Sequence, residues 1–225
     1  MQSGEEKDSR INEMQAMRWY RRPPLPVGLP VLLHPSGYRL VACPDGHPDR
    51  AELEAFLKSR YREVHGAEIT SFFPVLLALR DADGRLQGVS GYRSAAGDRL
   101  FLEQYLEQPV ERVIGDWLGW SVRRADIAEI GNFAALGCRR GQRLIELLID
   151  FVGQQGHLWA TFTGTRTIRL IMNHMGIPLH EVSAARRQQL LNSAENWGDY
   201  YSEDPRVVFA AVPAAARERQ LGVTV

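Results

Sequence analysis

The segment IAEIGNFAALGCRRGQRLIELLIDF (residues 127–151) joins a strand pattern to a helix pattern through one polar turn. Its first part is apolar or small except for Glu129 and one asparagine, and apolar side chains recur at helical spacing after Gly141. We therefore expect a strand over residues 127–136, a turn with two arginines, and a helix over residues 141–152. A strand that leads through a short turn into a helix is the start of a crossover connection.

The patterns on both sides of this segment predict a mixed α/β domain. Upstream they indicate a strand at 38–43, a helix that follows Asp49 and stops at Gly66, a hairpin around Asp83-Gly84, a short strand or helix at 100–106, and a helix opened by Pro109. Downstream they indicate a strand at 157–163, helices at 165–175 and 183–192, and a strand at 205–212. This order predicts a central mixed sheet flanked by helices.

Length and composition favour one domain with two tails. The chain has 225 residues and is 44% hydrophobic, which is enough to bury a sizeable core. Residues 1–30 are polar and then proline-rich, so we expect an extended N-terminal tail, a domain over residues 31–213 and a C-terminal tail over residues 214–225.

Several classes of function are disfavoured by charge and motif content. The 27 basic and 27 acidic residues are interspersed, which argues against nucleic-acid binding. Cys43 and Cys138 form no CxxC pair and the six histidines show no ligand spacing, so we expect no metal and no disulfide. A reducing cytoplasmic location fits this cysteine usage.

No membrane segment is expected from the sequence. The N-terminus has acidic residues and no apolar core of the kind found in secretory signals. Uninterrupted apolar runs of about 18 residues, which a transmembrane helix requires, are also missing from the sequence. Any membrane contact is therefore expected at the surface.

The polar turn before the predicted helix has the features of an anion site. Free backbone N–H groups and the positive end of the helix dipole favour phosphate-like groups. Arg139, Arg140 and Arg143 add guanidinium groups beside Gly141 and Gln142. The alternative is that these arginines only solvate a surface turn.

Five segments together resemble the bacterial thermostable hemolysin family over about residues 39–212. They are SRYREVHGAEITSFFPVLLALRDADGRLQGVSGYR, LFLEQYLEQPVE, AEIGNFAA, WATFTGTRTIRLIMNHMGIPLHEV and NWGDYYSEDPRVVFA. The order of elements also looks like the GCN5-related acyltransferases, and VLLALRDADGRLQGVSGYR with AEIGNFAA is distantly similar to acyl-homoserine-lactone synthases. The resemblance implies a GCN5-related acyltransferase-like fold.

The resemblance further implies a site for an acyl thioester. In GCN5-related enzymes a Q/R-x-x-G-x-G/A turn holds the pyrophosphate of coenzyme A or the phosphopantetheine of an acyl carrier. Here Arg139 stands where the first glycine of that turn is expected, and Gly141 keeps the last small position. The following strand, which ends at Phe162 and Thr163, splays from its neighbour in such folds and holds the pantetheine arm. The alternative for Thr163 is a helix cap.

Two residues are candidates for catalysis. Glu129 follows an alternation that places it on one face with Gly131 and Phe133, where a carboxylate could accept a proton from an amine; the alternative is an ion pair with an arginine. Tyr105 is a candidate general acid for a leaving thiolate, or a packed tyrosine with a satisfied hydroxyl.

Five polar and aromatic residues are candidates for contact with the acceptor substrate. Glu103 lies in a half-polar element, and Asn132 suits either a ligand amide or the end of a strand. Trp197, Tyr200 and Tyr201 belong to the segment ENWGDYYSEDP, which suits an aromatic acceptor pocket or a packed turn.

Three functions fit these observations. The first is transfer of an acyl group from acyl-coenzyme A or acyl carrier protein to a small amine or hydroxyl. The second is a membrane-active protein, as the family name implies, although no cationic amphipathic helix supports it. The third is a module that binds acyl thioesters without turnover, which the arginine at position 139 favours.

Overall fold

A computed structural model describes residues 30–191, 195–214 and 216. Almost all of the two expected tails, at residues 1–30 and 214–225, lies outside the described residues. The strands are β1 (Pro30–Leu33), β2 (Arg39–Pro44), β3 (Val75–Arg80), β4 (Leu86–Ser94), β5 (Ile127–Ala135), β6 (Trp159–Gly164), β7 (His180–Ala184) and β8 (Arg206–Ala211). The α-helices are α2 (Arg50–His65), α3 (Val110–Leu118), α4 (Cys138–Gln154) and α5 (Arg166–His174).

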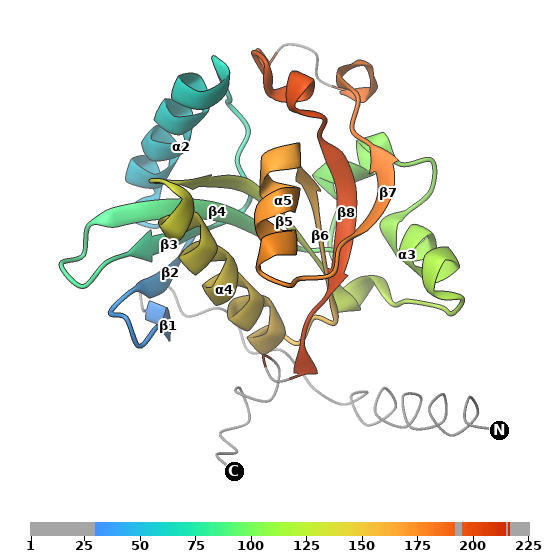
Figure 1. Cartoon of the computed structure of the whole chain (residues 1–225), viewed down its shortest axis with the longest axis horizontal. Helices are drawn as coiled ribbons and strands as arrows, with labels where there is room; N and C mark the ends of the chain where they lie inside the picture. Colours follow the sequence, from blue (N-terminus) through green and yellow to red (C-terminus); the bar gives the residue numbers. More distant parts are fainter. Residues whose placement is uncertain (1–29, 192–194, 215, 217–225) are drawn as a thin grey trace.

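The strands form one sheet in the order β1-β2-β3-β4-β5-β6-β8-β7 (Figure 1). All described neighbours are antiparallel except β5 and β6, which are parallel because α4 connects them as a crossover. The predicted mixed sheet is therefore confirmed, and its parallel pair lies at the crossover predicted after residue 127.

Helices cover both faces of the sheet. Leu77 and Leu79 of β3 pack with the apolar side of α4, whereas Leu76 and Ala78 pack with α2. Successive side chains of a strand point to opposite faces, so α4 and α2 lie on opposite sides. α4 and α5 lie in front of the sheet in Figure 1.

Short 3-10 helices complete the described elements. They are η2 (Phe101–Tyr105), η3 (Arg124–Asp126), η4 (Arg187–Gln189) and η5 (Tyr200–Glu203). The element at residues 100–106, left open between strand and helix, is thus a short helix. Within the described residues, none of the helices has both the length and the apolar character needed to cross a membrane.

Most predicted boundaries agree with the structure, including the left-handed stop at Gly66 (φ 62°). The helix predicted over residues 183–192 is wrong. Its start lies in the edge strand β7, whose backbone pairs with β8, and only η4 follows. Hydrogen bonds to a neighbouring strand outweigh the helix propensity of this alanine- and arginine-rich stretch. Residue 192 lies outside the described residues.

α4 also begins three residues earlier than the pattern predicts. Gly137 has a φ of 88°, which turns the chain directly after β5, and the N–H of Gly141 donates to the Gly137 carbonyl at 3.0 Å. The helix therefore starts at Cys138, and Arg139, Arg140 and Gly141 form its first turn.

Candidate active site

A β-bulge interrupts β5 next to Glu129. Gly131 pairs with Gly91 and Ala134 pairs with Val89, so two residues of β5 oppose Ser90 alone. Asn132 is one of these two residues, and its φ of 43° lies in the left-handed region. The bulge turns Phe133 toward α4, where its ring lies 4.0 Å from the position of a Cβ on Gly141. The expectation that Phe133 shares a face with Glu129 is therefore wrong.

Asn132 uses its side chain to hold a neighbouring loop. Its Oδ1 accepts the Phe73 N–H at 2.9 Å, and its Nδ2 donates to the Ser71 carbonyl at 3.3 Å. The ring of Phe73 lies directly over Gly91 and Gly131, where a Cβ would come within 2.8 Å of it. The bulge, the two glycines and this loop thus form one packed unit beside Glu129.

A cavity opens where β5 and β6 separate. The two strands pair only as far as Ile130 and Phe162, although both continue beyond these residues. The cavity has a volume of about 680 Å³ and is lined by residues from both faces of the sheet. This volume is in the range of small-molecule sites.

The part of the cavity between α4 and α5 is apolar. Its wall consists of aliphatic and thioether side chains, namely Ile145, Leu148, Ile149, Ile168, Ile171 and Met172. Such a wall offers hydrocarbon contacts without hydrogen-bonding groups, which suits an acyl chain.

The part of the cavity on the α2 side is polar and aromatic. Five of the residues predicted for the site line the cavity: Glu129 and Asn132 of β5, Thr163 of β6, and Trp197 and Tyr200. Phe162 and Gly141 also line the cavity. The structure therefore brings together seven predicted residues from four separate segments.

Glu129 is 2% exposed and accepts two backbone hydrogen bonds from η2. The Phe101 N–H donates to Oε2 at 3.0 Å and the Leu102 N–H to Oε1 at 2.8 Å. Burial raises the pKa of this carboxyl to about 7, while the two N–H groups and the charge of Arg93 act in the opposite direction. A carboxyl with such a pKa exchanges protons readily near neutral pH.

Three of the residues predicted for catalysis or acceptor binding do not line the cavity, namely Glu103, Tyr105 and Tyr201. Glu103 forms a buried ion pair with Arg124 (2.5 Å) and accepts the N–H groups of Leu100 and Val110, so its oxygens are used within the fold. Tyr105 is 2% exposed, and its hydroxyl lies 2.6 Å from that of Tyr201. Burial raises the pKa of both tyrosines.

The first turn of α4 reaches the cavity through backbone and small side chains. Gly137, Cys138 and Gly141 line it, and the three N–H groups before Gly141 have no partner within the helix. Arg139 and Arg140 are exposed beside this turn, and Arg140 donates to the Leu136 carbonyl at 2.8 Å.

The remaining polar residues of this turn do not line the cavity. The guanidinium group of Arg143 is paired with Glu146 and lies 2.8 Å from His34 Nε2. Gln142 is partly buried on the same helix. Of the five residues predicted for the anion site, only Gly141 therefore contacts the cavity.

The aromatic segment around Trp197 is anchored to α2. Asp199 donates its N–H to the carbonyl of His65 at 2.9 Å, and Gly198 lies so close to that carbonyl that a Cβ would come within 1.8 Å. The Trp197 ring packs beside Tyr61, with ring centroids 6.4 Å apart. The segment thus forms a fixed wall of the cavity.

The family is identified by the sequence of the described domain. The sequence model of the thermostable hemolysin family matches residues 43–216. The chain belongs to the thermostable hemolysin family. No curated protein matches it.

Solved structures share the fold of this thermostable hemolysin family member at low sequence identity. The acyl-homoserine-lactone synthase LasI is 13% identical, with a TM-score of 0.55 over 84% of this chain and 98% of LasI. BjaI, a CoA-dependent acyl-homoserine-lactone synthase solved with SAM and isopentyl-CoA, is 13% identical, with a TM-score of 0.52 over 83% and 89%. FeeM, an N-acyl amino acid synthase from uncultured soil microbes, is 13% identical, with a TM-score of 0.51 over 81% and 96%. The predicted acyltransferase-like fold is confirmed.

Two residues of the cavity wall, Arg93 and Phe73, were not predicted from the sequence of this hemolysin family member. Arg93 lines the cavity from β4 and lies directly opposite Glu129 in the sheet. Its guanidinium carbon is 4.8 Å from the centre of the Phe73 ring. The available signal was an arginine near the end of a strand that has no other charged residue. Only the strand pairing connects it to Glu129.

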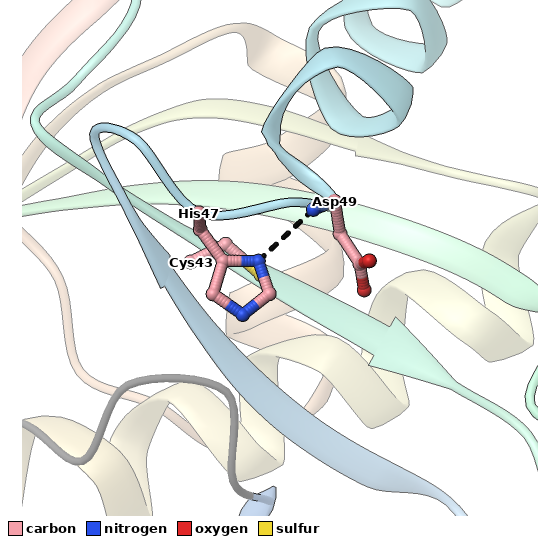
Figure 2. Close-up of side chains that lie close together, drawn as sticks. All are labelled: Cys43, His47 and Asp49. Carbon is pink, nitrogen blue, oxygen red and sulfur yellow. Dashed lines mark hydrogen bonds between the residues drawn. The ribbon is translucent and has the colours of Figure 1, made fainter.

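A second cluster of chemically active side chains lies away from the cavity. Cys43, His47 and Asp49 bring potential metal-ligand atoms within 4.8 Å of one another (Figure 2). However, Asp49 is paired with Arg80 at 3.0 Å, and His47 Nδ1 accepts the Asp49 N–H at 3.1 Å. Burial also raises the pKa of the Cys43 thiol to about 11. These three groups are engaged with the protein and fit a metal poorly.

Proposed function

We propose that this thermostable hemolysin family member is an acyltransferase that moves an acyl group from a thioester to a small amine. The observation that carries the proposal is one cavity with two unlike ends. An apolar compartment lies between α4 and α5, and a polar compartment with Glu129 lies toward α2. Such a cavity accommodates an acyl chain and an amine at the same time. A hydroxyl acceptor would use the same arrangement.

The donor is acyl-coenzyme A or an acyl carrier protein, with its pantetheine arm in the gap between β5 and β6. Beyond Ile130 and Phe162 these two strands no longer pair with each other, so their facing edges can bind the arm, and Thr163 of β6 lines the cavity there. The first turn of α4 offers three N–H groups to the phosphate at the end of the arm. The exposed Arg139 and Arg140 add positive charge beside it.

The chemical step is a nucleophilic substitution at the thioester carbonyl. The amine nitrogen forms a bond to the carbonyl carbon, and the bond from carbon to sulfur breaks. Glu129 in its ionised form takes the proton that the nitrogen loses and later returns it to solvent, and the leaving thiolate takes up one proton from solvent to become a thiol. The products are an amide and a free thiol. A carboxyl with a pKa of about 7 is suited to this transfer.

The proposal is tested with purified protein, acyl thioesters of several chain lengths and a panel of amines. Coenzyme A and acyl carrier protein serve as alternative carriers. Release of the thiol is followed together with formation of the amide by mass spectrometry, so that simple hydrolysis is recognised. Expected are an amide product and a fall in kcat of about 10²-fold or more for Glu129→Gln.

A matched control and two contrary outcomes complete this test. Arg112→Gln changes an exposed residue of α3 outside the cavity and is expected to keep the wild-type rate. Tight binding of a thioester without an amide product would make the protein a binding module. Leakage of liposomes in the absence of any thioester, with no amide product, would favour the membrane-active alternative.

A further inference from the structure

Four buried polar atoms without a partner gather around the cavity. Among the described residues they are Arg60 Nε, Arg93 Nε, Trp197 Nε1 and Thr163 Oγ1, and all four residues line the cavity. Three of these atoms are N–H donors. Because a buried donor without an acceptor costs free energy, such groups are normally paired. Their concentration at one cavity points to a ligand that supplies acceptor oxygens.

Arg93 is held in place by groups other than a carboxylate of the protein. Its Nη1 donates to the Arg99 carbonyl at 3.2 Å, and its guanidinium group lies over the ring of Phe73. Phe73 is in turn fixed by Asn132. A guanidinium group that is oriented in advance and keeps a free N–H is a good partner for a carboxylate.

Trp197 contributes a second fixed donor. Its ring packs near those of Tyr61 and Phe101, with centroid distances of 6.4 Å and 6.3 Å. The backbone of Phe101 is bound to Glu129, so the indole and the carboxyl belong to one packed region. An indole N–H donates only, and an oxygen of the ligand is its natural partner.

The neighbouring Glu129 limits the charge of the ligand. Arg93 and Glu129 are directly opposite on antiparallel strands, so their Cβ atoms are about 5 Å apart. A ligand with an anionic group beside an amine matches this pair, because the anion meets Arg93 and the amine meets Glu129. A dianionic phosphate would be repelled by Glu129 and by Glu203, which also lines the cavity.

We propose that the acceptor is an α-amino acid, or another amine with a carboxylate on the adjacent carbon. Arg93 and Trp197 bind the carboxylate, and Arg60 adds a further donor from α2. This inference rests on the proposed acyl transfer and names its acceptor class. The amino nitrogen then forms the amide bond as described above, and the products are an N-acyl amino acid and a free thiol.

A binding experiment tests the carboxylate site without turnover. N-dodecanoylglycine is compared with N-dodecanoylglycinamide, which has the same shape but no charge, by thermal shift and calorimetry. The wild type is expected to bind the acid roughly tenfold or more tightly than the amide. Arg93→Gln is expected to lose most of this preference, and Arg112→Gln is expected to behave as the wild type.

Two further variants keep the test decisive if Arg93→Gln folds poorly. Arg93→Lys keeps the charge and is expected to retain part of the preference for the acid. Trp197→Phe keeps the ring, removes the N–H and is expected to reduce the preference. Equal affinity of the wild type for acid and amide, or an undiminished preference for the acid in Arg93→Gln, would overturn the proposal.

A parallel assay separates this inference from the proposed function. Acyl transfer to glycine is compared with transfer to glycinamide. Transfer to glycine alone supports both proposals. Equal transfer to both amines supports the acyltransferase and overturns the carboxylate acceptor. No transfer to either amine, with the acid still bound more tightly, overturns the acyltransferase and the acceptor together and leaves a carboxylate-binding protein.

Discussion

Arg93 of β4 and Glu129 of β5 are directly paired across the sheet and line the same cavity. Burial raises the pKa of Glu129, and the positive charge of Arg93 opposes this rise. The result is a carboxyl that titrates near neutral pH beside a guanidinium group with a free N–H. This pair accounts for both halves of the proposed chemistry: proton transfer and recognition of the acceptor.

The pKa of Glu129 predicts a pH dependence of stability. Between about pH 4.5 and about pH 7 the folded protein keeps the Glu129 proton, whereas the unfolded chain loses it. The free energy of unfolding therefore falls as pH rises through this window, by up to about 3 kcal/mol from this residue. Glu129→Gln lacks this contribution.

The measurement is urea unfolding of the wild type and Glu129→Gln at both ends of that window. Other carboxyls that do not interact with Glu129, such as Glu195 with its lowered pKa, titrate in both proteins and cancel in the difference. The stability of the wild type relative to the variant should decrease toward neutral pH. A difference that does not change with pH would show that Glu129 has an ordinary pKa.

Gly131 is predicted to be required for the seating of Phe73. A Cβ at this position would lie 2.5 Å from the Phe73 ring, so Gly131→Ala should lower the free energy of unfolding by about 1–3 kcal/mol. Phe73→Leu in the same chain should recover part of this loss. Gly97→Ala, where a Cβ has open space, is the control. Additive effects of the two changes would contradict the predicted contact.

The hydroxyl pair of Tyr105 and Tyr201 is predicted to stabilise the fold and not to take part in catalysis. Tyr105→Phe and Tyr201→Phe should each cost about 1 kcal/mol, and the double variant should cost less than their sum. The kcat of acyl transfer should stay unchanged. A large fall in kcat for Tyr105→Phe at wild-type stability would instead support its sequence-based interpretation as a general acid.

Most strands and helices could be predicted because their signals are local. Apolar spacing, Gly66 and Asp83-Gly84 mark strands, a helix end and a turn within a few residues. The strand β7 could not be predicted, because its conformation depends on pairing with β8, which lies more than 20 residues later. Local propensity there favours a helix.

The site could be predicted only in part, because it also depends on how the strands pair. Glu129 and Trp197 stand out as unusual residues in their segments, but the bulge at Asn132 depends on how β5 pairs with β4. The bulge decides which side chains face the cavity, as the position of Phe133 shows. The role of Arg93 can be recognised only from its pairing with Glu129 on the next strand. The basic turn predicted Arg143 as an anion-binding residue. In the structure its guanidinium group is paired with Glu146, one helical turn away.

Cys138 offers a direct measurement of donor binding. It is exposed and lines the cavity at the first turn of α4, whereas Cys43, the other cysteine of the chain, is fully buried. Labelling of the native protein with N-ethylmaleimide therefore reports on Cys138, and Cys138→Ser verifies the assignment. Alkyl-coenzyme A thioethers, which are not hydrolysed and carry no free thiol, serve as donor analogues.

The rate of Cys138 labelling with and without these thioethers tests the central claim most directly. If an acyl thioester occupies the gap between β5 and β6, the rate falls with thioether concentration in proportion to occupancy, and longer alkyl chains protect at lower concentration. The same protection is expected from a carrier protein that bears an alkyl group. Labelling that stays unchanged with every chain length and both carriers would contradict the account.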